Sequence, residues 1–139
     1  MTDPDDAPDD GDDDPIFDAA LSAPPGLAVR ILDLSGANGS DPVEVVRGFL
    51  SVAHANAFAR RYVRDSLERC RTRGMAPEAV LEAWFAYGED AEVAGAGDDA
   101  WKSASELKDF AAARPADAEE RNWRVLDPRR DDEEAEEEE

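Results

Sequence analysis

This sequence has only one histidine and one cysteine, two residue types that can take part in catalysis. Both are predicted to lie on one long helix. His54 falls in the first turn, where the positive helix end disfavours protonation of the ring. Cys70 falls on the apolar stripe of the helix, which favours a buried, unreactive thiol. We therefore expect a surface or capping role for His54 and a packing role for Cys70. A small enzyme that uses His54 as a general base stays an alternative.

A run of arginines on the same helix is the second chemically capable group. Residues 60–73 hold six arginines and two acids, within a chain of net charge −20. Four of these arginines are candidates for binding a partner: Arg60, Arg61, Arg64 and Arg71. The pairs Arg61–Asp65 and Arg64–Glu68, one turn apart, would each stabilise the helix by only about 0.2–0.5 kcal/mol. The face is thus either solvated surface or a site for an anion, such as nucleic-acid phosphate, an acidic partner or the chain's own tails.

Acidic and glycine-rich motifs give weaker signals. A carboxylate cluster is formed by Glu89, Asp90, Glu92, Asp98 and Asp99. Its spacing matches no EF-hand loop, so no metal site is predicted. Residues 95–100 fit the loose pattern G-x-G-x-x-A, but Asp98 and Asp99 would repel a pyrophosphate. Residues 105–108 have Ser-x-x-Lys spacing without the rest of that motif set. No cofactor and no catalytic residue is predicted, and an enzyme is not expected.

The charge is concentrated at the two ends of the chain. Residues 1–18 hold nine acids and residues 131–139 hold eight, with no base in either segment. Such like-charge blocks repel themselves and bury little apolar surface, so both are predicted to be disordered. The 139 residues allow one domain. The predicted organisation is an acidic tail and linker at 1–26, one domain at 27–128 and an acidic tail at 129–139.

Other compositional features exclude whole classes of protein. No apolar run reaches the length that a membrane helix needs. The acidic first segment is unlike a signal peptide, and a single cysteine allows neither an internal disulfide nor a Cys-pair zinc site. The 13 arginines against two lysines suit a GC-rich bacterial genome, and the acidity of the chain also suits a halophile. The sequence is therefore interpreted as a cytoplasmic protein.

The elements of the first half follow from periodicity. Branched apolar residues predict strands at 27–34 and 43–50, antiparallel because the loop between them is too short for a crossover helix. Ser51 is predicted to cap a helix that runs to about Thr72 and is stopped by Gly74. The predicted apolar face of this helix consists of Ala55, Phe58, Ala59, Tyr62, Val63, Ser66, Leu67 and Cys70.

The second half is predicted as shorter elements. Pro77 begins a helix that ends near Gly88, and residues 91–94 suit an edge strand. Ser103 and Glu106 have capping-box spacing, which predicts a helix at 104–114. Residues 122–126 are predicted to be a last strand. The aromatic residues of this half are expected mostly in the core, with one tryptophan free for an interface: Trp84, Phe85, Tyr87, Trp101, Phe110 and Trp123.

Together these elements predict a small α+β domain, with a short antiparallel sheet packed on one face by two or three helices. Without a catalytic constellation, the sequence favours a noncatalytic protein-binding or regulatory module. An acidic nucleic-acid mimic that acts on a basic protein is the alternative from another class. Direct binding to duplex nucleic acid is disfavoured, because the tails would raise the electrostatic cost of approach.

Overall fold

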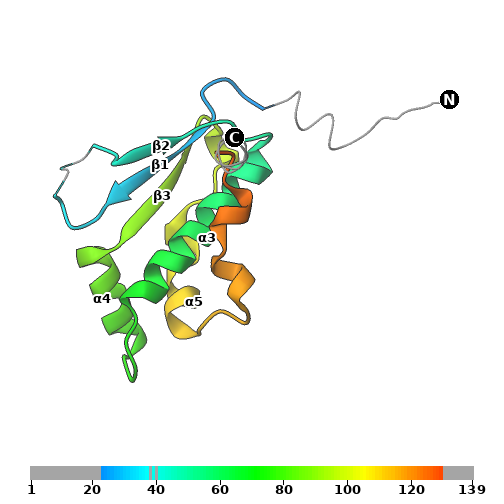
Figure 1. Cartoon of the computed structure of the whole chain (residues 1–139). Coiled ribbons are helices and arrows are strands. Elements are labelled where there is room, and N and C mark those ends of the chain that lie inside the picture. The colour runs from blue at the N-terminus through cyan, green and yellow to red at the C-terminus, as the bar shows by residue number, and fades with distance from the viewer. Residues whose placement is uncertain (1–22, 38, 40, 130–139) are drawn as a thin grey trace, which may run out of the picture.

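The computed structural model describes residues 23–37, 39 and 41–129 (Figure 1). The disorder predicted at both ends falls, for residues 1–22 and 130–139, outside the described residues. The described part confirms a small single α+β domain with a three-stranded antiparallel sheet and three helices. It extends slightly past the predicted limits, because Ala23 packs against the core and Arg129 pairs with Glu44 and Asp127.

The sheet has the order β2-β1-β3, with both pairs antiparallel. Its strands are β1 (Ala28–Asp33), β2 (Glu44–Val46) and β3 (Glu89–Ala94). The predicted strands at 27–34 and 91–94 are confirmed, the latter as an edge strand two residues longer. The second strand ends after Val46 rather than at Leu50, because Gly48 has a φ of 98°, which is incompatible with an extended strand.

Successive side chains along each strand point to opposite faces of the sheet, and here one face is apolar and the other is polar. Val29 lies beside Val46 on one neighbouring strand and beside Val93 on the other, and all three are buried. Arg30, the next residue, lies on the opposite face and forms an ion pair with Glu92 across the strands at 2.6 Å. The helices therefore cover the face that carries Val29.

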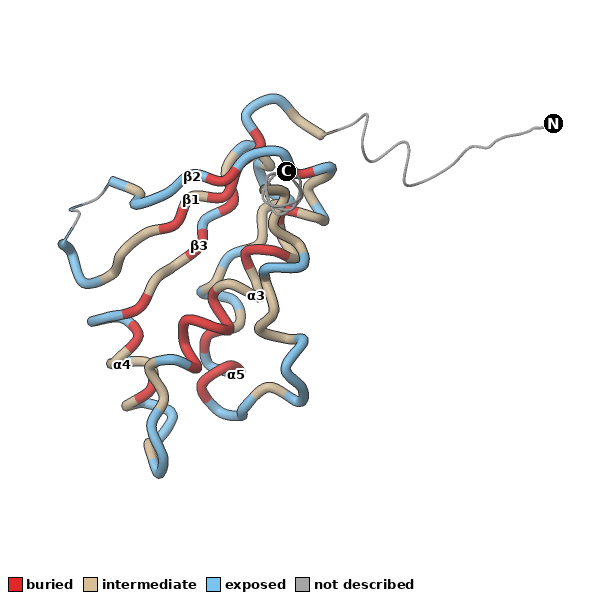
Figure 2. The backbone as a smooth tube through the Cα atoms, viewed as in Figure 1, coloured by how far each residue is buried: buried red, intermediate tan, exposed pale blue. Residues whose placement is uncertain are grey.

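The central helix is α3 (Val52–Cys70), as predicted. Its first turn is capped by the Ser51 hydroxyl, which accepts a hydrogen bond from the His54 amide at 3.1 Å. The helix packs one side against β1 and β3, where Phe58, Val63 and Leu67 are fully buried. Figure 2 shows buried positions along much of its length.

The C-terminal segment, residues 103–129, covers the other side of α3 (Figure 1). The molecule therefore has three layers, with α3 in the middle. As a result Arg64, Asp65 and Glu68 are only 4%, 6% and 7% exposed. The interpretation of the charged side of α3 as solvated surface is thus wrong, because the segment that covers it is far away in sequence.

The second half of the chain is partly as predicted. Helix α4 (Pro77–Tyr87) follows α3 and ends at Gly88. A Cβ atom at Gly88 would lie 2.3 Å from the Trp84 ring, so only glycine fits there. The predicted helix at 104–114 is shorter, with a 3-10 turn η2 (Ser103–Ser105) before α5 (Leu107–Ala112).

Two local predictions for the C-terminal segment are wrong. The capping box does not form, because the Glu106 carboxylate binds Arg60 and Trp101 instead. The predicted strand at 122–126 is a 3-10 helix, η4 (Trp123–Leu126), which follows η3 (Ala118–Arg121). Residues three apart share a face in this geometry, so Trp123 and Leu126 both pack against the core.

Candidate functional site

The His54 ring joins three segments of the backbone. Its Nδ1 atom accepts a hydrogen bond from the Leu50 amide at 3.1 Å, and Nε2 donates to the Leu126 carbonyl at 2.7 Å. Because an amide only donates and a carbonyl only accepts, the ring is neutral with its proton on Nε2. The ring also packs edge-on against Phe49. Both nitrogens are therefore engaged by backbone groups, in an arrangement suited to holding the C-terminal segment.

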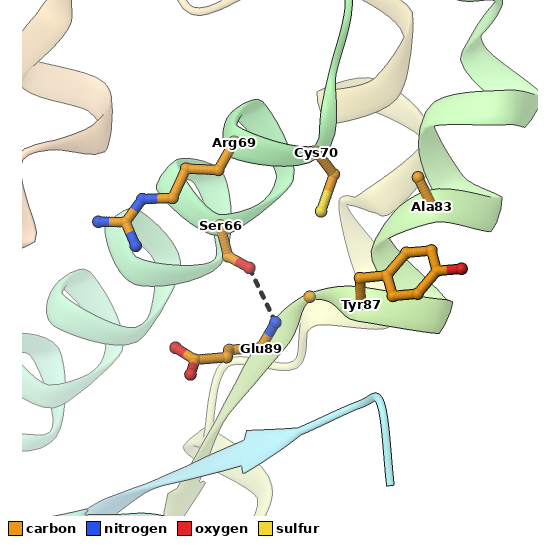
Figure 3. A pocket seen from close by; sticks show the side chains of 7 residues that line it. Ser66, Arg69, Cys70, Ala83, Tyr87 and Glu89 are labelled. Atoms are coloured by element: carbon orange, nitrogen blue, oxygen red, sulfur yellow. Dashed lines mark hydrogen bonds between the residues drawn. The ribbon is translucent and has the colours of Figure 1, made fainter. Parts of the chain in front are cut away.

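Cys70 lines a groove between the C-terminal ends of α3 and α4 (Figure 3). The groove has a volume of about 450 Å³ and is lined by Ser66, Arg69, Cys70, Ala83, Tyr87, Gly88 and Glu89. The Cys70 sulfur points into the space between the two helices. Partial burial raises the pKa of the thiol, which lowers the thiolate fraction that a nucleophile needs.

Polar groups at the groove floor hold the fold together. The Ser66 hydroxyl accepts a hydrogen bond from the Glu89 amide at 2.8 Å, which fixes the start of β3 against α3 (Figure 3). The Tyr62 hydroxyl donates to the Glu89 carboxylate at 2.6 Å. Burial and this carboxylate together raise the pKa of Tyr62. Ser66, Tyr62 and Glu89 are thus used in packing, and the groove is better suited to binding than to proton transfer.

Two aromatic side chains of α4 are exposed, and one of them, Tyr87, lines this groove. Phe85 is 55% exposed and Tyr87 is 78% exposed, and Phe85 packs edge-on against the buried Trp84. One of the three tryptophans was predicted to be free for an interface; Trp84 is buried in the core, whereas Trp101 and Trp123 are only partly buried. A signal was present in the sequence, because the apolar residues of Pro77–Tyr87 are too many for one helix face.

The candidate arginines Arg60 and Arg64 contact the C-terminal segment. Arg60 donates two hydrogen bonds to the Glu106 carboxylate, at 2.8 and 2.9 Å, and this pairing lowers the pKa of Glu106. Arg64 donates to the carbonyls of Phe110 and Ala113, both at 2.7 Å. Arg64 also lies 3.7 Å from Glu68, as the sequence spacing predicted.

The candidate arginines Arg71 and Arg61 have internal acceptors as well. Arg71 donates two hydrogen bonds to Glu68 at 2.8 Å, and one to the Phe110 carbonyl at 2.7 Å. Arg61 donates to the Asn122 carbonyl at 3.1 Å and does not form the predicted pair with Asp65. Binding of a partner by these four arginines stays a prediction, but each of them already connects α3 to another part of the fold or of the helix.

Asp65 is a junction that the sequence did not indicate. Its carboxylate lies 2.7 Å from Arg121 and 2.9 Å from Arg69, and it accepts a hydrogen bond from the Trp123 indole at 3.1 Å. Arg121 and Trp123 are more than 50 positions away, so only the tertiary structure shows this grouping. The junction fixes η3 and η4 on α3.

The predicted carboxylate cluster does not come together as a unit. Glu92 pairs with Arg30, and Asp90 accepts a hydrogen bond from the Ala91 amide. Burial raises the pKa of Asp90. Within the part of the chain that the structure describes, no three His, Cys, Asp or Glu side chains are grouped so that they could hold a metal ion. The same residues include no helix that is long and apolar enough to cross a bilayer.

Comparisons with protein-family models, with curated proteins and with solved structures each found no match to this chain. The case for a function therefore depends on the chemistry of the surface.

Proposed function

We propose that the domain is a noncatalytic protein-binding module, and that it binds its partner through the groove that Tyr87 lines. The observation that carries this proposal is the exposure of Tyr87, 78%, at the rim of a hollow of about 450 Å³. We call this surface the aromatic groove, formed by Cys70, Ala83 and Tyr87 with Arg69 and Glu89 at its edges.

The composition of the aromatic groove suits protein recognition. Tyrosine buries a large area with few rotatable bonds, so it contributes strongly to binding when a partner covers it. The groove walls are the ends of two helices, held by the Ser66–Glu89 contact, so little ordering is needed on binding. The charged groups of Arg69 and Glu89 point away from Tyr87 (Figure 3) and are engaged by Asp65 and Tyr62, so recognition would depend on the apolar and aromatic part of the groove.

The chemistry of the candidate catalytic residues supports binding over catalysis. The His54 ring nitrogens bind backbone groups, and burial raises the pKa of Cys70. The single cysteine also suits a cytoplasmic protein that needs no disulfide. We accordingly propose a cytoplasmic interaction module.

The test is affinity capture from native lysate with three forms of the full chain: wild type, Y87A and L50A. Leu50 is 58% exposed at the other end of α3, so L50A is a matched loss of exposed apolar surface outside the groove. We expect at least one protein to be captured by the wild type and L50A but not by Y87A. Equal capture by all three forms would overturn the assignment to the aromatic groove.

The same experiment separates the nucleic-acid mimic from this proposal. A mimic acts through its 17 tail acids, so its capture would survive Y87A and would weaken steeply with salt. Capture through the aromatic groove would change little between low and high salt, because burial of aromatic rings is only weakly salt-dependent.

A further inference from the structure

A cluster of guanidinium groups lies at a hollow between α3 and the C-terminal segment. Arg121 and Arg124 line the hollow, whereas Arg61 and Arg69 contact residues that line it. The hollow has a volume of about 680 Å³ and is lined by Asp65, Ala118, Glu119, Arg121, Asn122 and Arg124. We call the cluster the guanidinium patch, and it consists of Arg61, Arg69, Arg121 and Arg124. Its net charge is positive in a chain of net charge −20.

The charges of the guanidinium patch are only partly neutralised. Arg69 and Arg121 share one carboxylate, Asp65, so the group of three keeps a positive charge. Glu119 is highly exposed and lies 3.9 Å from Arg61, the limit of an ion pair. Arg69 and Arg121 share one carboxylate, and Arg61 has only a distant one. These three guanidinium groups can therefore bind further carboxylates.

Arg124 is the fourth member of the patch, and Glu120 is the acid that lies near it in sequence. Arg124 is exposed, lies over the Trp123 ring at 4.5 Å, and forms no ion pair with a carboxylate of the described residues. The Glu120 carboxylate accepts a hydrogen bond from the Ala116 amide, and its field acts on Arg60 and Arg64. Glu120 therefore does not compensate the charge of Arg124.

We propose that the guanidinium patch is the docking site of the chain's own acidic run, residues 131–139. This run holds eight acids in nine residues and begins five residues after Leu126, the last residue of η4, which carries Arg124. The described chain ends near the first turn of α3, where His54 binds Leu126. Asp65 lies eleven residues further along α3, about 16 Å away at the rise of a helix. Nine extended residues span about 30 Å, so the run reaches the patch.

The C-terminal run fits this site better than the N-terminal one. The nine acids of residues 1–18 are interrupted by three prolines. The described chain that follows them begins at Ala23, which packs against the core before β1. The docked run would lie beside Arg69, which also lines the aromatic groove. The proposal does not depend on the function of that groove.

The first test is zero-length crosslinking of the full chain with a carbodiimide, which joins a carboxylate to a lysine amine but not to a guanidinium. The variant R69K places an amine on the patch, and the control R73K places one at an exposed site one turn beyond it. Lys102 and Lys108 are present in both variants and serve as internal references.

The expected result is an amide between position 69 and residues 131–139, with a yield at least about fivefold above that of position 73 in about 0.01 M salt. This yield should fall to that of R73K in about 1 M salt, where the Debye length is about 3 Å. Equal yields in the two variants, or crosslinks from position 69 mainly to residues 3–18, would overturn the proposal.

A second measurement does not alter the domain. The eight acids of residues 131–139 are replaced by their amides, and the Nε–Hε NMR signals of the arginines are compared with those of the wild type. We expect shifts at Arg69 and Arg124 and none at Arg30, which lies on the polar face of the sheet, paired with Glu92. Unchanged signals at Arg69 and Arg124 would overturn the proposal.

Discussion

The two sides of α3 are built from different interactions. Towards the sheet, Phe58, Val63 and Leu67 pack against strands in a layer of apolar side chains. Towards the C-terminal segment, guanidinium groups bind carbonyls and carboxylates, as Arg64 does with Phe110 and Ala113. The first interface depends on shape and area, and the second on the direction of individual hydrogen bonds.

This difference shows how a small domain can bury the charged face of a helix in an internal interface. Three charged residues of α3 are almost fully buried, and each has a partner of opposite charge or a backbone acceptor. Buried charges without such partners would be very costly, so the C-terminal segment must dock with correct geometry. We therefore expect mutations on the sheet side to destabilise the whole domain, and mutations on the other side to act first on residues 103–129.

The largest effect is expected from F58A. Phe58 is fully buried and contacts Phe49, Tyr62 and Trp123, so it belongs to both interfaces. Its loss should reduce the free energy of unfolding by about 3–5 kcal/mol. Urea unfolding followed by circular dichroism measures this, with F85A as the control. Because Phe85 is exposed, F85A should change the stability by less than about 0.5 kcal/mol. Similar losses in both variants would contradict the description of the core.

The next effect is expected from D65N, which removes the charge shared by Arg69 and Arg121. Breaking a buried ion pair costs about 3 kcal/mol, and here the loss should appear locally. Amide hydrogen exchange should become faster in η3 and η4 and stay unchanged in β1 and β3. The control D98N alters an exposed acid and should change neither. Uniformly faster exchange would show that the two interfaces unfold together.

A smaller, pH-dependent effect is expected from E106Q. The Arg60 hydrogen bond lowers the pKa of Glu106 in the folded state below its ordinary value of 4.5. Ionised Glu106 therefore stabilises the fold above pH 4.5, and this contribution is lost as the pH falls through the lowered value. Since the pair is partly exposed, E106Q should cost about 1 kcal/mol at pH 7. Urea unfolding at several pH values should show the two proteins converging in acid, and a constant difference would contradict this account.

The smallest effect is expected from E92Q on the open face of the sheet. The Arg30–Glu92 pair has good geometry, but both side chains are well exposed. An exposed pair contributes about 0.2–1 kcal/mol, so E92Q should cost less than E106Q. Urea unfolding at low and high salt measures the difference. A larger loss for E92Q than for E106Q would contradict the ranking of buried over exposed pairs.

The apolar interface could be predicted from the sequence because its signals are local. Strand 27–34, the Ser51 cap and the apolar face of α3 follow from spacing and turn residues within about twenty positions. The α+β fold class follows from these elements and is confirmed. The short β2 was missed because strand propensity at Phe49 and Leu50 conceals the left-handed conformation of Gly48.

The polar interface could not be predicted because its partners are distant in sequence. Asp65 meets Trp123 across 58 positions, and Arg64 meets Ala113 across 49. From the helical spacing alone, Arg64 and Asp65 are both predicted to lie on a solvated face. The predicted bounds of the helix at 104–114 were wrong for a related reason, because Glu106 forms a tertiary ion pair with Arg60 instead of capping the helix. The aromatic groove was missed because the exposure of Tyr87 depends on how α4 meets α3.

The position of the C-terminal segment has a consequence for biosynthesis. A ribosome makes the sheet, α3 and α4 before residues 103–129 leave it, so the partly made domain presents the outer side of α3 to water. An apolar side would then attract other unfinished chains. Arg64, Asp65 and Glu68 instead keep that surface hydrated until residues 103–129 arrive and cover it. We therefore expect the charged face of α3 to limit aggregation of the partly made chain, and to become an internal interface once residues 103–129 have docked.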